Sequence, residues 1–530
     1  MVDTMPTELA ARSTAPKHFL ALLGTLLVLT IAWVFATPLG AVPDEPAHMI
    51  RAAASARGEA VGVKPAGDEF GYPVVQVPDW VAESFHLPCE VGDASKTAEC
   101  VPSVGDDTTL TPSSSSSASN SPVFYTVVGL PSLFITGDAG LYAMRIMSAI
   151  LTSLLLAAMI LALRAQSRTV WPVVAGFVTA TPMVFFLGGS TNVNGVEAAG
   201  AGAVAAIALL LVRTKMTDKQ LWIWSILLGL SVIGVTSGRT VALLWVVIAA
   251  IVTLIIARPA KLLELIRKPA IWVGLAIIIL AVVWVFVWFQ FISITAVDPR
   301  GYDEDRDPSL KLLLSIMVEY TFNWWGPWIG QFGWLEVSAP IGVQIIWQGA
   351  IAALLFGAFV MTRGRARVAT IFIALAVFIV PIALQGSLWI EVGWIWQGRY
   401  MLPVYLILMV AVGVVLDMST KPGATALQVR FIRAAIVLLA ASHLITFVFV
   451  LRRFIVANQN WLAMFTQPEW QPPLTWIGIS AVLAVGLALQ VALVYRWTKS
   501  VLSVENDREI IEVQPDPQSD TTPALVKEQP

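Results

Sequence analysis

The chain has 530 residues, of which 57% are hydrophobic and only 13% charged. Ordinary soluble proteins carry about a quarter charged residues, and the mean hydropathy here is +0.76. These values exclude a soluble globular protein and indicate an all-α polytopic membrane protein, because many apolar runs reach the roughly 20 residues that a helix needs to cross a bilayer. The net charge of −2 excludes little, since the position of each charge decides the topology.

About twelve membrane-spanning helices are predicted from the apolar runs. The first, "FLALLGTLLVLTIAWVFATPLG", is longer than the apolar core of a signal peptide and lacks a clear cleavage site, so we expect a retained span. The predicted spans cover residues 19–38, 141–163, 170–189, 195–212, 221–237, 240–257, 270–292, 340–361, 368–386, 400–417, 431–451 and 474–495.

Basic residues alternate between loops along the chain. With the N-terminus inside, the inner loops read "RAQSR", "RTKMTDK", "ARPAKLLELIRK", "TRGRAR", "KPGATALQVRFIR" and "YRWTKS", whereas the outer turns "STNVNG" and "SGR" hold one arginine between them. This positive-inside pattern predicts that both termini are cytoplasmic. We therefore expect a disordered cytoplasmic N-terminus over 1–18, a transmembrane domain over 19–497 and a disordered cytoplasmic tail over 498–530.

One long hydrophilic loop, residues 41–140, follows the first span on the extracytoplasmic side. It is too long to be structureless, so part of it should fold onto the membrane surface, while its low-complexity stretch "TPSSSSSASNSP" is expected to be mobile. Cys89 and Cys100 both lie in this loop and are expected to form a disulfide, with two free thiols as the alternative. The stretch "CEVGDASKTAEC" itself supplies no histidine or further cysteine to complete a zinc site, and no P-loop motif indicates an ATPase.

The stretch "AVPDEPAHMIRAA" concentrates charge directly after the first span. As a helix start it places Asp44 at the N-cap, where its carboxylate can accept from free backbone N–H groups. Asp44, His48 and Arg51 then share one helical stripe, and Glu45 points about a quarter-turn away. A carboxylate beside an imidazole and a guanidinium can act as a base, a metal ligand or a salt-bridge partner. The alternative is a capped interfacial helix with a solvated salt bridge.

Further polar residues gather at the same outer face from later segments, where ionisable groups usually meet a cavity or a partner. Sugar transfer from a lipid-phosphate donor would use such a set: a carboxylate takes the proton of the acceptor hydroxyl, and an arginine holds the departing phosphate. Outside the cell no nucleotide is present, so no nucleotide-binding domain is required. The residues are Asn192, Asn194 and Glu197 in "STNVNGVE", Arg239 in "SGR", Glu336 in "FGWLEVSAP", and Gln397, Arg399 and Tyr400 in "QGRYMLP".

Five motifs in order, "PDEPAH", "SPVFYTVVGLPS", an "SxNxxG" turn, "FGWLEVSAP" and "QGRYMLP", resemble the bacterial membrane-protein family catalogued as domain of unknown function 2142. The resemblance covers roughly residues 20 to 450. That family is similar to the GT-C glycosyltransferase superfamily, whose members use polyprenyl-phosphate sugars. The resemblance implies a GT-C-like fold in the bacterial plasma membrane, a polyprenyl-phosphate sugar donor, a cell-envelope glycan or glycolipid as acceptor, and no nucleic-acid partner.

Roles for particular residues follow from the same resemblance. An acidic residue in the first outer loop is the catalytic base or metal ligand in these enzymes, which implies Asp44 first and Glu45 second. An arginine near a later span holds the donor phosphate, which implies Arg399, with Arg239 and His48 as helpers. The family's Asn-Pro-Asp in the turn after span three reads "NVNG" here, so the metal-binding carboxylate is missing and a divalent cation on Asp44 and Glu45 is optional. The substrate would be lined by Arg51, Asn192, Asn194, Gln397, Tyr400 and Glu336.

Two other classes of function remain open from the sequence. A transporter or flippase of a lipid-linked sugar suits twelve spans interrupted by glycine and proline, although the span interiors are nearly free of charge and the two halves of the chain show no clear similarity. A non-catalytic membrane protein of envelope assembly is the other alternative.

Overall fold

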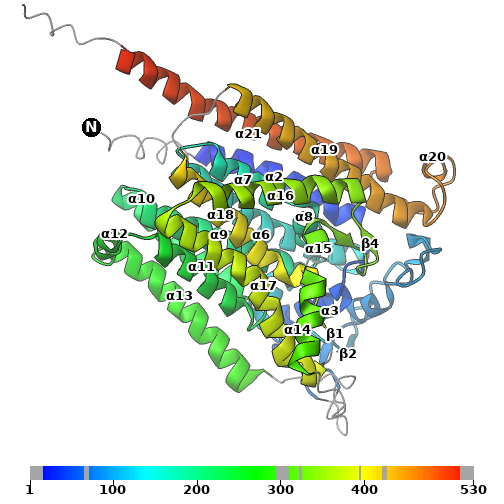
Figure 1. Ribbon diagram of the computed structural model, residues 1–530. Helices are drawn as coiled ribbons and strands as arrows, with labels where there is room; N and C mark the ends of the chain where they lie inside the picture. The colour runs from blue at the N-terminus through cyan, green and yellow to red at the C-terminus, as the bar shows by residue number, and fades with distance from the viewer. Residues whose placement is uncertain are drawn as a thin grey trace, which may run out of the picture.

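The computed structural model describes residues 16–64, 71–293, 309–321, 325–392, 395–420 and 426–513, and it is nearly all helical (Figure 1). Among these residues, ten helices are long and apolar enough to cross a membrane. They are α2 (Pro16–Ala36), α6 (Gly137–Gln166), α9 (Val193–Arg213), α10 (Asp218–Thr236), α13 (Pro269–Val287, extended by the π-helical turn Trp288–Ile292), α16 (Ile341–Met361), α17 (Gly364–Val392), α18 (Leu402–Ser419), α19 (Ala426–Val456) and α21 (Thr475–Val513).

Two further spans are bent pairs of helices. Helix α7 (Trp171–Thr179) meets α8 (Pro182–Gly188) at 55°, and α11 (Ala242–Ile256) meets α12 (Pro259–Leu265) at 117°. In each pair the second helix begins with a proline, and the residue before it is extended because the proline ring disfavours helical backbone there. Counting each pair as one span gives up to twelve, which coincide with the twelve predicted apolar runs. The predicted all-α polytopic membrane architecture is therefore confirmed.

Helices α9 and α18 form the centre of the bundle and are almost entirely buried. The sequence of α9, "VNGVEAAGAGAVAAIALLLVR", is rich in glycine and alanine, which let neighbouring helices approach closely. A Cβ added at Gly202 would lie 2.5 Å from the sulfur of Met159 and 3.2 Å from Leu406 Cβ. Helices α6 and α18 can therefore pack directly against the backbone of α9.

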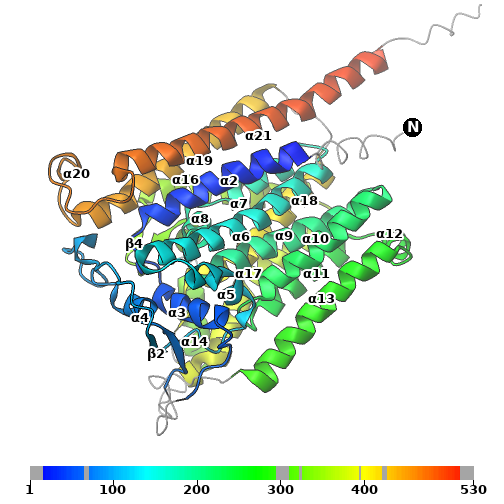
Figure 2. The ribbon, with the colours of Figure 1, turned by 180° about the vertical axis from the view of Figure 1, so that it is seen from behind.

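Helices α19 and α21 run side by side along α2 at one edge of the bundle (Figure 2). Helix α21 continues to Val513, so helical structure extends beyond residue 497, where the sequence predicted the start of a disordered tail. The predicted disordered segment 1–18 lies almost wholly outside the described residues. The limits of the predicted domains stay predictions.

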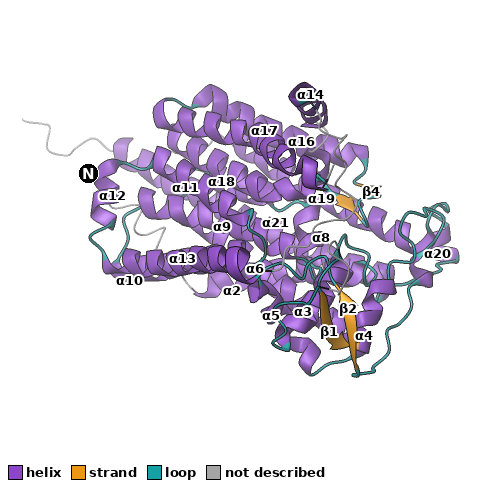
Figure 3. Cartoon of the chain, turned by 90° about the horizontal axis from the view of Figure 1, so that it is seen from below, coloured by secondary structure: helices purple, strands orange, loops and turns teal. Residues whose placement is uncertain are grey.

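The long loop after the first span folds into a small cap at one end of the bundle (Figure 3). Its two strands pair antiparallel, with Val74 opposite Ser114 and Pro78 opposite Leu110. The cap has its own apolar core, which includes Ile50, Val77, Trp80 and Phe124. Its elements are α3 (Glu45–Ala56), β1 (Val74–Pro78), α4 (Asp79–Ala82), the 3-10 turns η1 (Glu83–His86) and η2 (Ala98–Cys100), β2 (Leu110–Ser114), α5 (Pro122–Gly129) and η3 (Leu130–Leu133).

The serine-rich stretch of this loop is held in place, so the expectation that it is mobile was wrong. Ser115 and Ser117 are buried, and the Ser115 hydroxyl donates to the Ala47 carbonyl at 2.7 Å. The indole N–H of Trp288 donates to the Ser119 carbonyl at 3.0 Å. Low sequence complexity was misleading here, because the small hydroxyl side chains fit closely between the rest of the cap and the end of α13.

The remaining elements bring later segments to the same end of the bundle. A short hairpin joins β3 (Gln331–Phe332) to β4 (Val337–Ser338), and its Trp334 indole donates to the Gly40 carbonyl at 2.9 Å. The 3-10 turn η7 (Gly398–Met401) leads directly into α18. The others are α14 (Leu310–Thr321), α15 (Trp325–Ile329) and α20 (Ala463–Thr466).

Candidate active site

Asp44 and Arg399, 355 residues apart in the chain, are in direct contact. Arg399 Nη2 donates to Asp44 Oδ2 at 2.5 Å, and Arg399 Nη1 donates to the Pro43 carbonyl at 3.2 Å. The Arg399 side chain is 1% exposed, whereas the Asp44 carboxylate is 44% exposed. The buried guanidinium therefore presents a half-exposed acid to solvent at the end of the bundle that carries the cap.

Asp44 has an unusual backbone. It stands at the N-cap of α3 with φ of 64° and ψ of 3°, the left-handed region, and its side chain makes no capping hydrogen bond. The predicted N-cap position is thus confirmed, but the predicted capping contact is wrong, because the turned backbone directs the carboxylate to Arg399. Burial opposes ionisation of Asp44, yet the charge of Arg399 outweighs it and lowers the pKa of this carboxyl below its ordinary value.

A second guanidinium lies close to the first. Arg239 and Arg399 each lie over the ring of Tyr400, with 5.3 Å from each guanidinium carbon to the ring centroid. Arg239 is held by Glu197, which accepts from Arg239 Nη2 at 2.7 Å and from the indole N–H of Trp245. Burial opposes the charge of Arg239, but Glu197 outweighs it and raises the pKa further. The result is a pair of fixed positive charges around one aromatic ring.

Glu45 differs from its neighbour in having no exposed surface. Its Oε1 accepts from Arg145 Nε at 2.7 Å and from the Thr191 backbone N–H at 3.0 Å, and its Oε2 accepts from Arg145 Nη2 at 2.5 Å. Both side chains of this ion pair are 0% exposed. Arg145 also donates to the carbonyls of Val34, Thr37 and Pro38. The pair ties α6 to the segment that carries Asp44, and it leaves Glu45 little freedom to act as a base.

The turn before α9 holds the same segment from another side. Asn192 Nδ2 donates to the Pro43 carbonyl at 3.0 Å, and Asn192 Oδ1 caps α9 by accepting from the Asn194 backbone N–H. Pro43 therefore receives hydrogen bonds from both Asn192 and Arg399. The two asparagines predicted to line a substrate stand beside Asp44, with Asn192 engaged in positioning it.

His48 belongs to a buried network of hydroxyl groups. Its Nδ1 lies 2.8 Å from the Tyr125 hydroxyl and 3.0 Å from Ser117 Oγ, and the Tyr125 hydroxyl accepts from Asn120 Nδ2. The assignment that uses every donor has Tyr125 donating to Nδ1, which leaves the proton of the neutral ring on Nε2. Burial lowers the pKa of His48 to about 4 against the attraction of Asp44. His48 is therefore neutral at pH 7, so any contact with a donor phosphate would be made by a neutral N–H group, and its role as a helper in phosphate binding stays a prediction.

Arg51, predicted to line the substrate, is fully buried inside the cap. Its guanidinium donates to the carbonyls of Ala60 and Asn120, both at 2.6 Å, and lies near the rings of Tyr125 and Trp288. These hydrogen bonds and ring contacts surround the buried guanidinium and join α3 to the serine-rich stretch. A substrate-lining role for Arg51 stays a prediction.

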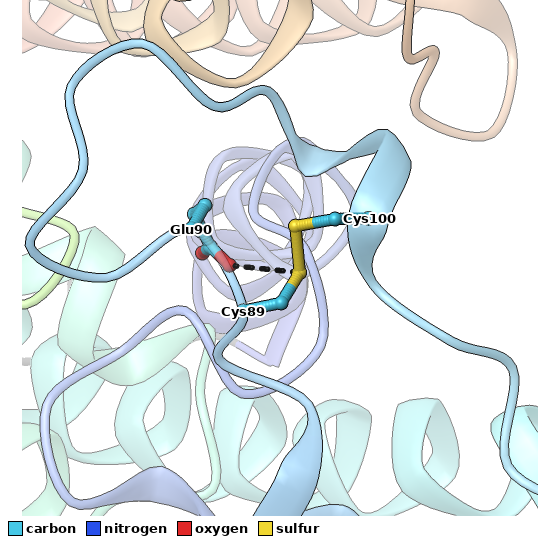
Figure 4. Close-up of side chains that lie close together, drawn as sticks. All are labelled: Cys89, Glu90 and Cys100. Atoms are coloured by element: carbon cyan, nitrogen blue, oxygen red, sulfur yellow. Dashed lines mark hydrogen bonds between the residues drawn. A yellow bond between two sulfur atoms is a disulfide. The ribbon is translucent and has the colours of Figure 1, made fainter.

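Glu336 lies in a different cluster. It accepts from Arg453 Nη2 at 3.0 Å, and Arg453 also donates to the carbonyls of Glu90, Asp93 and Lys96. These carbonyls belong to the small loop that the predicted disulfide between Cys89 and Cys100 closes (Figure 4). The cluster anchors the cap to the end of α19, and a substrate-lining role for Glu336 stays a prediction.

Several buried polar atoms near Asp44 have no hydrogen-bond partner. They are Arg399 Nε, Gln397 Oε1, Asn194 Oδ1 and Thr191 Oγ1. An unpaired buried polar atom costs about 1–3 kcal/mol, so such a group indicates a polar ligand or water. The set combines a charged donor with neutral acceptors, which suits an anion that carries hydroxyl groups.

A divalent cation does not fit the residues around Asp44. Two guanidinium groups stand beside that carboxylate and repel positive charge, and Arg145 occupies both oxygens of Glu45. Among the described residues, Cys89, Glu90 and Cys100 lie close enough to one another to hold a metal ion. Their sulfurs are bonded to each other, so they are not available as thiolate ligands.

Some residues of the site escaped the sequence analysis. Arg145 interrupts the apolar run "LYAMRIMSA", and a charge inside a span is a signal that could have identified it. Glu197 was noted at the outer rim, but its pairing with Arg239 was not expected. Ser117 and Tyr125 gave no signal, because a serine-rich stretch and a single tyrosine are common in loops.

The fold and the site define a polytopic helical membrane protein with an acid and two guanidinium groups gathered at one end of its bundle. The chain belongs to the family described as "Predicted membrane protein (DUF2142)", whose model matches residues 27–408. No curated protein matches it significantly in sequence.

Two solved structures show a similarity to the chain at 16% sequence identity and a TM-score of 0.41 each. One is ArnT from Cupriavidus metallidurans in the apo state, for which the match covers 90% of this chain and 76% of that one. The other is the same protein bound to undecaprenyl phosphate, with 94% and 82% covered.

Proposed function

We propose that the chain is an inverting glycosyltransferase that takes a sugar from a polyprenyl-phosphate donor at the outer face of the bacterial plasma membrane. The observation that carries the proposal is the contact of Asp44 with Arg399, with Arg239 beside it across the Tyr400 ring. A half-exposed carboxylate supplies a base, and two fixed guanidinium groups match the oxygens of a phosphate. The resemblance to GT-C enzymes in the outer-loop acid and the later arginine points the same way.

The reaction follows from these roles. The acceptor hydroxyl attacks the anomeric carbon of the donor sugar, and its proton passes to Asp44. The bond from that carbon to the phosphate oxygen breaks, and the bonding electrons leave with the polyprenyl phosphate. Arg399 and Arg239 stabilise the growing charge on the leaving phosphate. A single displacement inverts the configuration at the anomeric carbon.

The contact of Asp44 with Arg399 gives the donor a second role. In the free site Arg399 lowers the pKa of Asp44, which makes this carboxylate a weak base. A donor phosphate that takes over Nη2, together with the unpartnered Nε, draws the guanidinium away from Asp44. The pKa of Asp44 then rises towards the range in which general-base catalysis is efficient. Donor binding would thus prepare the base for the acceptor.

Glu45 takes a positioning role in this proposal. Its buried pair with Arg145 and its bond from Thr191 fix the segment on which Asp44 stands. A carboxylate with no exposed surface has no path to an acceptor hydroxyl. Asp44 is therefore the base, and Glu45 holds it in place.

The membrane setting is part of the proposal. The basic inner loops support an orientation with both termini in the cytoplasm and the cap outside, where the two cysteines can remain oxidised. The donor's polyprenyl tail would stay in the bilayer, and the acceptor would be a glycan or glycolipid of the cell envelope. No step requires a metal ion or a nucleotide.

Transfer by the purified chain in liposomes tests the proposal. The probe is a radiolabelled polyprenyl-phosphate hexose with envelope glycolipid extract as acceptor. We expect Asp44→Asn to lower kcat by about 10²–10⁴-fold, the usual contribution of a general base, and Arg399→Gln to raise KM for the donor. Asp218→Asn is the matched control, because its exposed ion pair with Lys268 lies outside the site.

Retained transfer in Asp44→Asn would remove this mechanism. Movement of the labelled lipid across the bilayer without any glycosidic product would instead favour a flippase. Loss of transfer in Asp218→Asn to the same degree would show that the assay reports folding rather than chemistry.

A further inference from the structure

A groove lies between α19 and α21, the two helices that run along one edge of the bundle (Figures 1 and 2). It encloses about 500 Å³ and is lined by Arg433, Val437, Leu438, Ala441, Val491 and Tyr495. This volume falls within the range of roughly 300–1,000 Å³ that is common for ligand sites. Apart from Arg433 and the hydroxyl of Tyr495, the lining is apolar.

The groove lies at the end of the bundle opposite Asp44. Arg453, near the end of α19, binds the cap, and Arg433 lies 20 residues earlier on the same helix. At 1.5 Å per residue the two are roughly 30 Å apart, about the thickness of the hydrocarbon core. Val437 and Leu438 are 55% and 51% exposed. In a membrane-spanning helix, apolar side chains exposed to this degree face lipid.

Arg433 is an unusual residue in such a lining. Its guanidinium carbon lies 3.6 Å from the centre of the Tyr495 ring, and its buried Nε has no hydrogen-bond partner. A charged group in a lipid-facing groove needs a counter-charge or a path to water. No salt bridge of Arg433 is found among the described residues.

The surroundings of the groove are basic. Three further basic side chains are exposed on α19 and α21 near the groove, namely Arg430, Arg496 and Lys499. No acidic residue occurs in α19 or between Thr475 and Lys499 of α21. On the other side of α21, the Arg164 guanidinium lies 4.5 Å from the ring of Trp497 and also has an unpartnered nitrogen, Nη1. The charge of this region is complementary to that of an anion.

We infer that the groove binds an anionic phospholipid of the leaflet at this end, with one acyl chain between α19 and α21 and the phosphate on Arg433. The apolar lining takes the chain, and the stacked guanidinium offers its free N–H groups to the phosphate oxygens. The site is separate from the proposed transfer site by the thickness of the membrane. Its existence does not depend on the proposed function.

Native mass spectrometry of the full-length protein in detergent tests this inference. The protein is titrated with dioleoyl phosphatidylglycerol and, in parallel, with dioleoyl phosphatidylcholine, which has the same chains and no net charge. We expect the first bound lipid to be phosphatidylglycerol with about fivefold preference, the effect of one basic residue near an anionic headgroup, because the choline cation of phosphatidylcholine cancels its phosphate charge. Arg433→Gln should remove the preference, and Ala441→Phe should weaken binding of both lipids by filling the groove.

Arg430→Gln is the matched control, because it removes the same charge from an exposed position on the same helix. We expect it to keep the preference. An excess of inorganic phosphate should not displace the lipid, since the acyl chain supplies part of the affinity. Equal binding of the two lipids by the wild type, or an unchanged preference in Arg433→Gln, would overturn the inference.

Discussion

The two adjacent carboxylates should respond very differently to loss of charge. Glu45→Gln leaves Arg145 fully buried without its counter-charge, and breaking such a pair costs about 3–5 kcal/mol. Asp44→Asn also removes the counter-charge of a buried guanidinium, Arg399, but the lost carboxylate is 44% exposed and water can reach the pair, so we expect a smaller cost of about 1–2 kcal/mol. Glu45→Gln should therefore destabilise the protein more than Asp44→Asn does.

The thermal unfolding midpoint of the purified protein, followed by tryptophan fluorescence, measures this difference. A Glu45→Gln/Arg145→Met double variant serves as the control, since replacing both members of a buried pair with neutral groups is far less costly than removing one. We expect it to be more stable than Glu45→Gln alone. Equal destabilisation by Asp44→Asn and Glu45→Gln, or a double variant no more stable than the single one, would refute the separation of roles.

Three further predictions concern the cap and the side chains proposed to bind the donor phosphate. His48 should contribute a fall in stability of roughly 3 kcal/mol between pH 6.5 and 4, because unfolded histidine takes up a proton near 6.5 whereas buried His48 does so only at about 4. His48→Gln should therefore reduce the dependence of the unfolding midpoint on pH, and an unchanged dependence would contradict the neutral, buried state of His48. Replacing Cys89 and Cys100 together by serine should lower the free energy of unfolding by about 2–3 kcal/mol. The loop around Arg453 should become sensitive to protease, while transfer is retained below the lowered unfolding temperature. A loop that stays protected from protease would contradict its dependence on the disulfide. Tyr400→Leu should raise KM for the donor about tenfold, because it removes the two cation–π contacts of Arg239 and Arg399. Tyr400→Phe keeps the ring and should leave KM unchanged. Equal KM values for the two variants would show that the ring has no role in donor binding.

The spans could be predicted almost completely from the sequence, since hydropathy and basic loops determine them directly. That Asp44 and Arg399 act in one site was expected only through the family resemblance, and their direct contact was not expected, because no local pattern links residues 355 positions apart. The different exposure and ion-pair partners of Asp44 and Glu45 could not be predicted. They depend on the left-handed turn at Asp44 and on Arg145, whose place against Glu45 is set by tertiary packing.

The serine-rich stretch shows a second limit. Its composition predicted mobility, but Ser117 contacts His48 and Ser119 accepts from Trp288. Small polar residues carry little information about partners that are distant in sequence. Whether such residues are ordered in the folded protein depends on the side chains that pack against them.

The left-handed backbone of Asp44 restricts which residues could ever replace it. Glycine, asparagine and aspartate adopt this conformation readily, and longer or β-branched side chains do so at a cost. Of the three tolerated residues, one alone carries a carboxylate. Glutamate would keep the charge but strain the turn and reach one methylene group further than Asp44 does towards Arg399, so aspartate is the acid that suits this backbone position best.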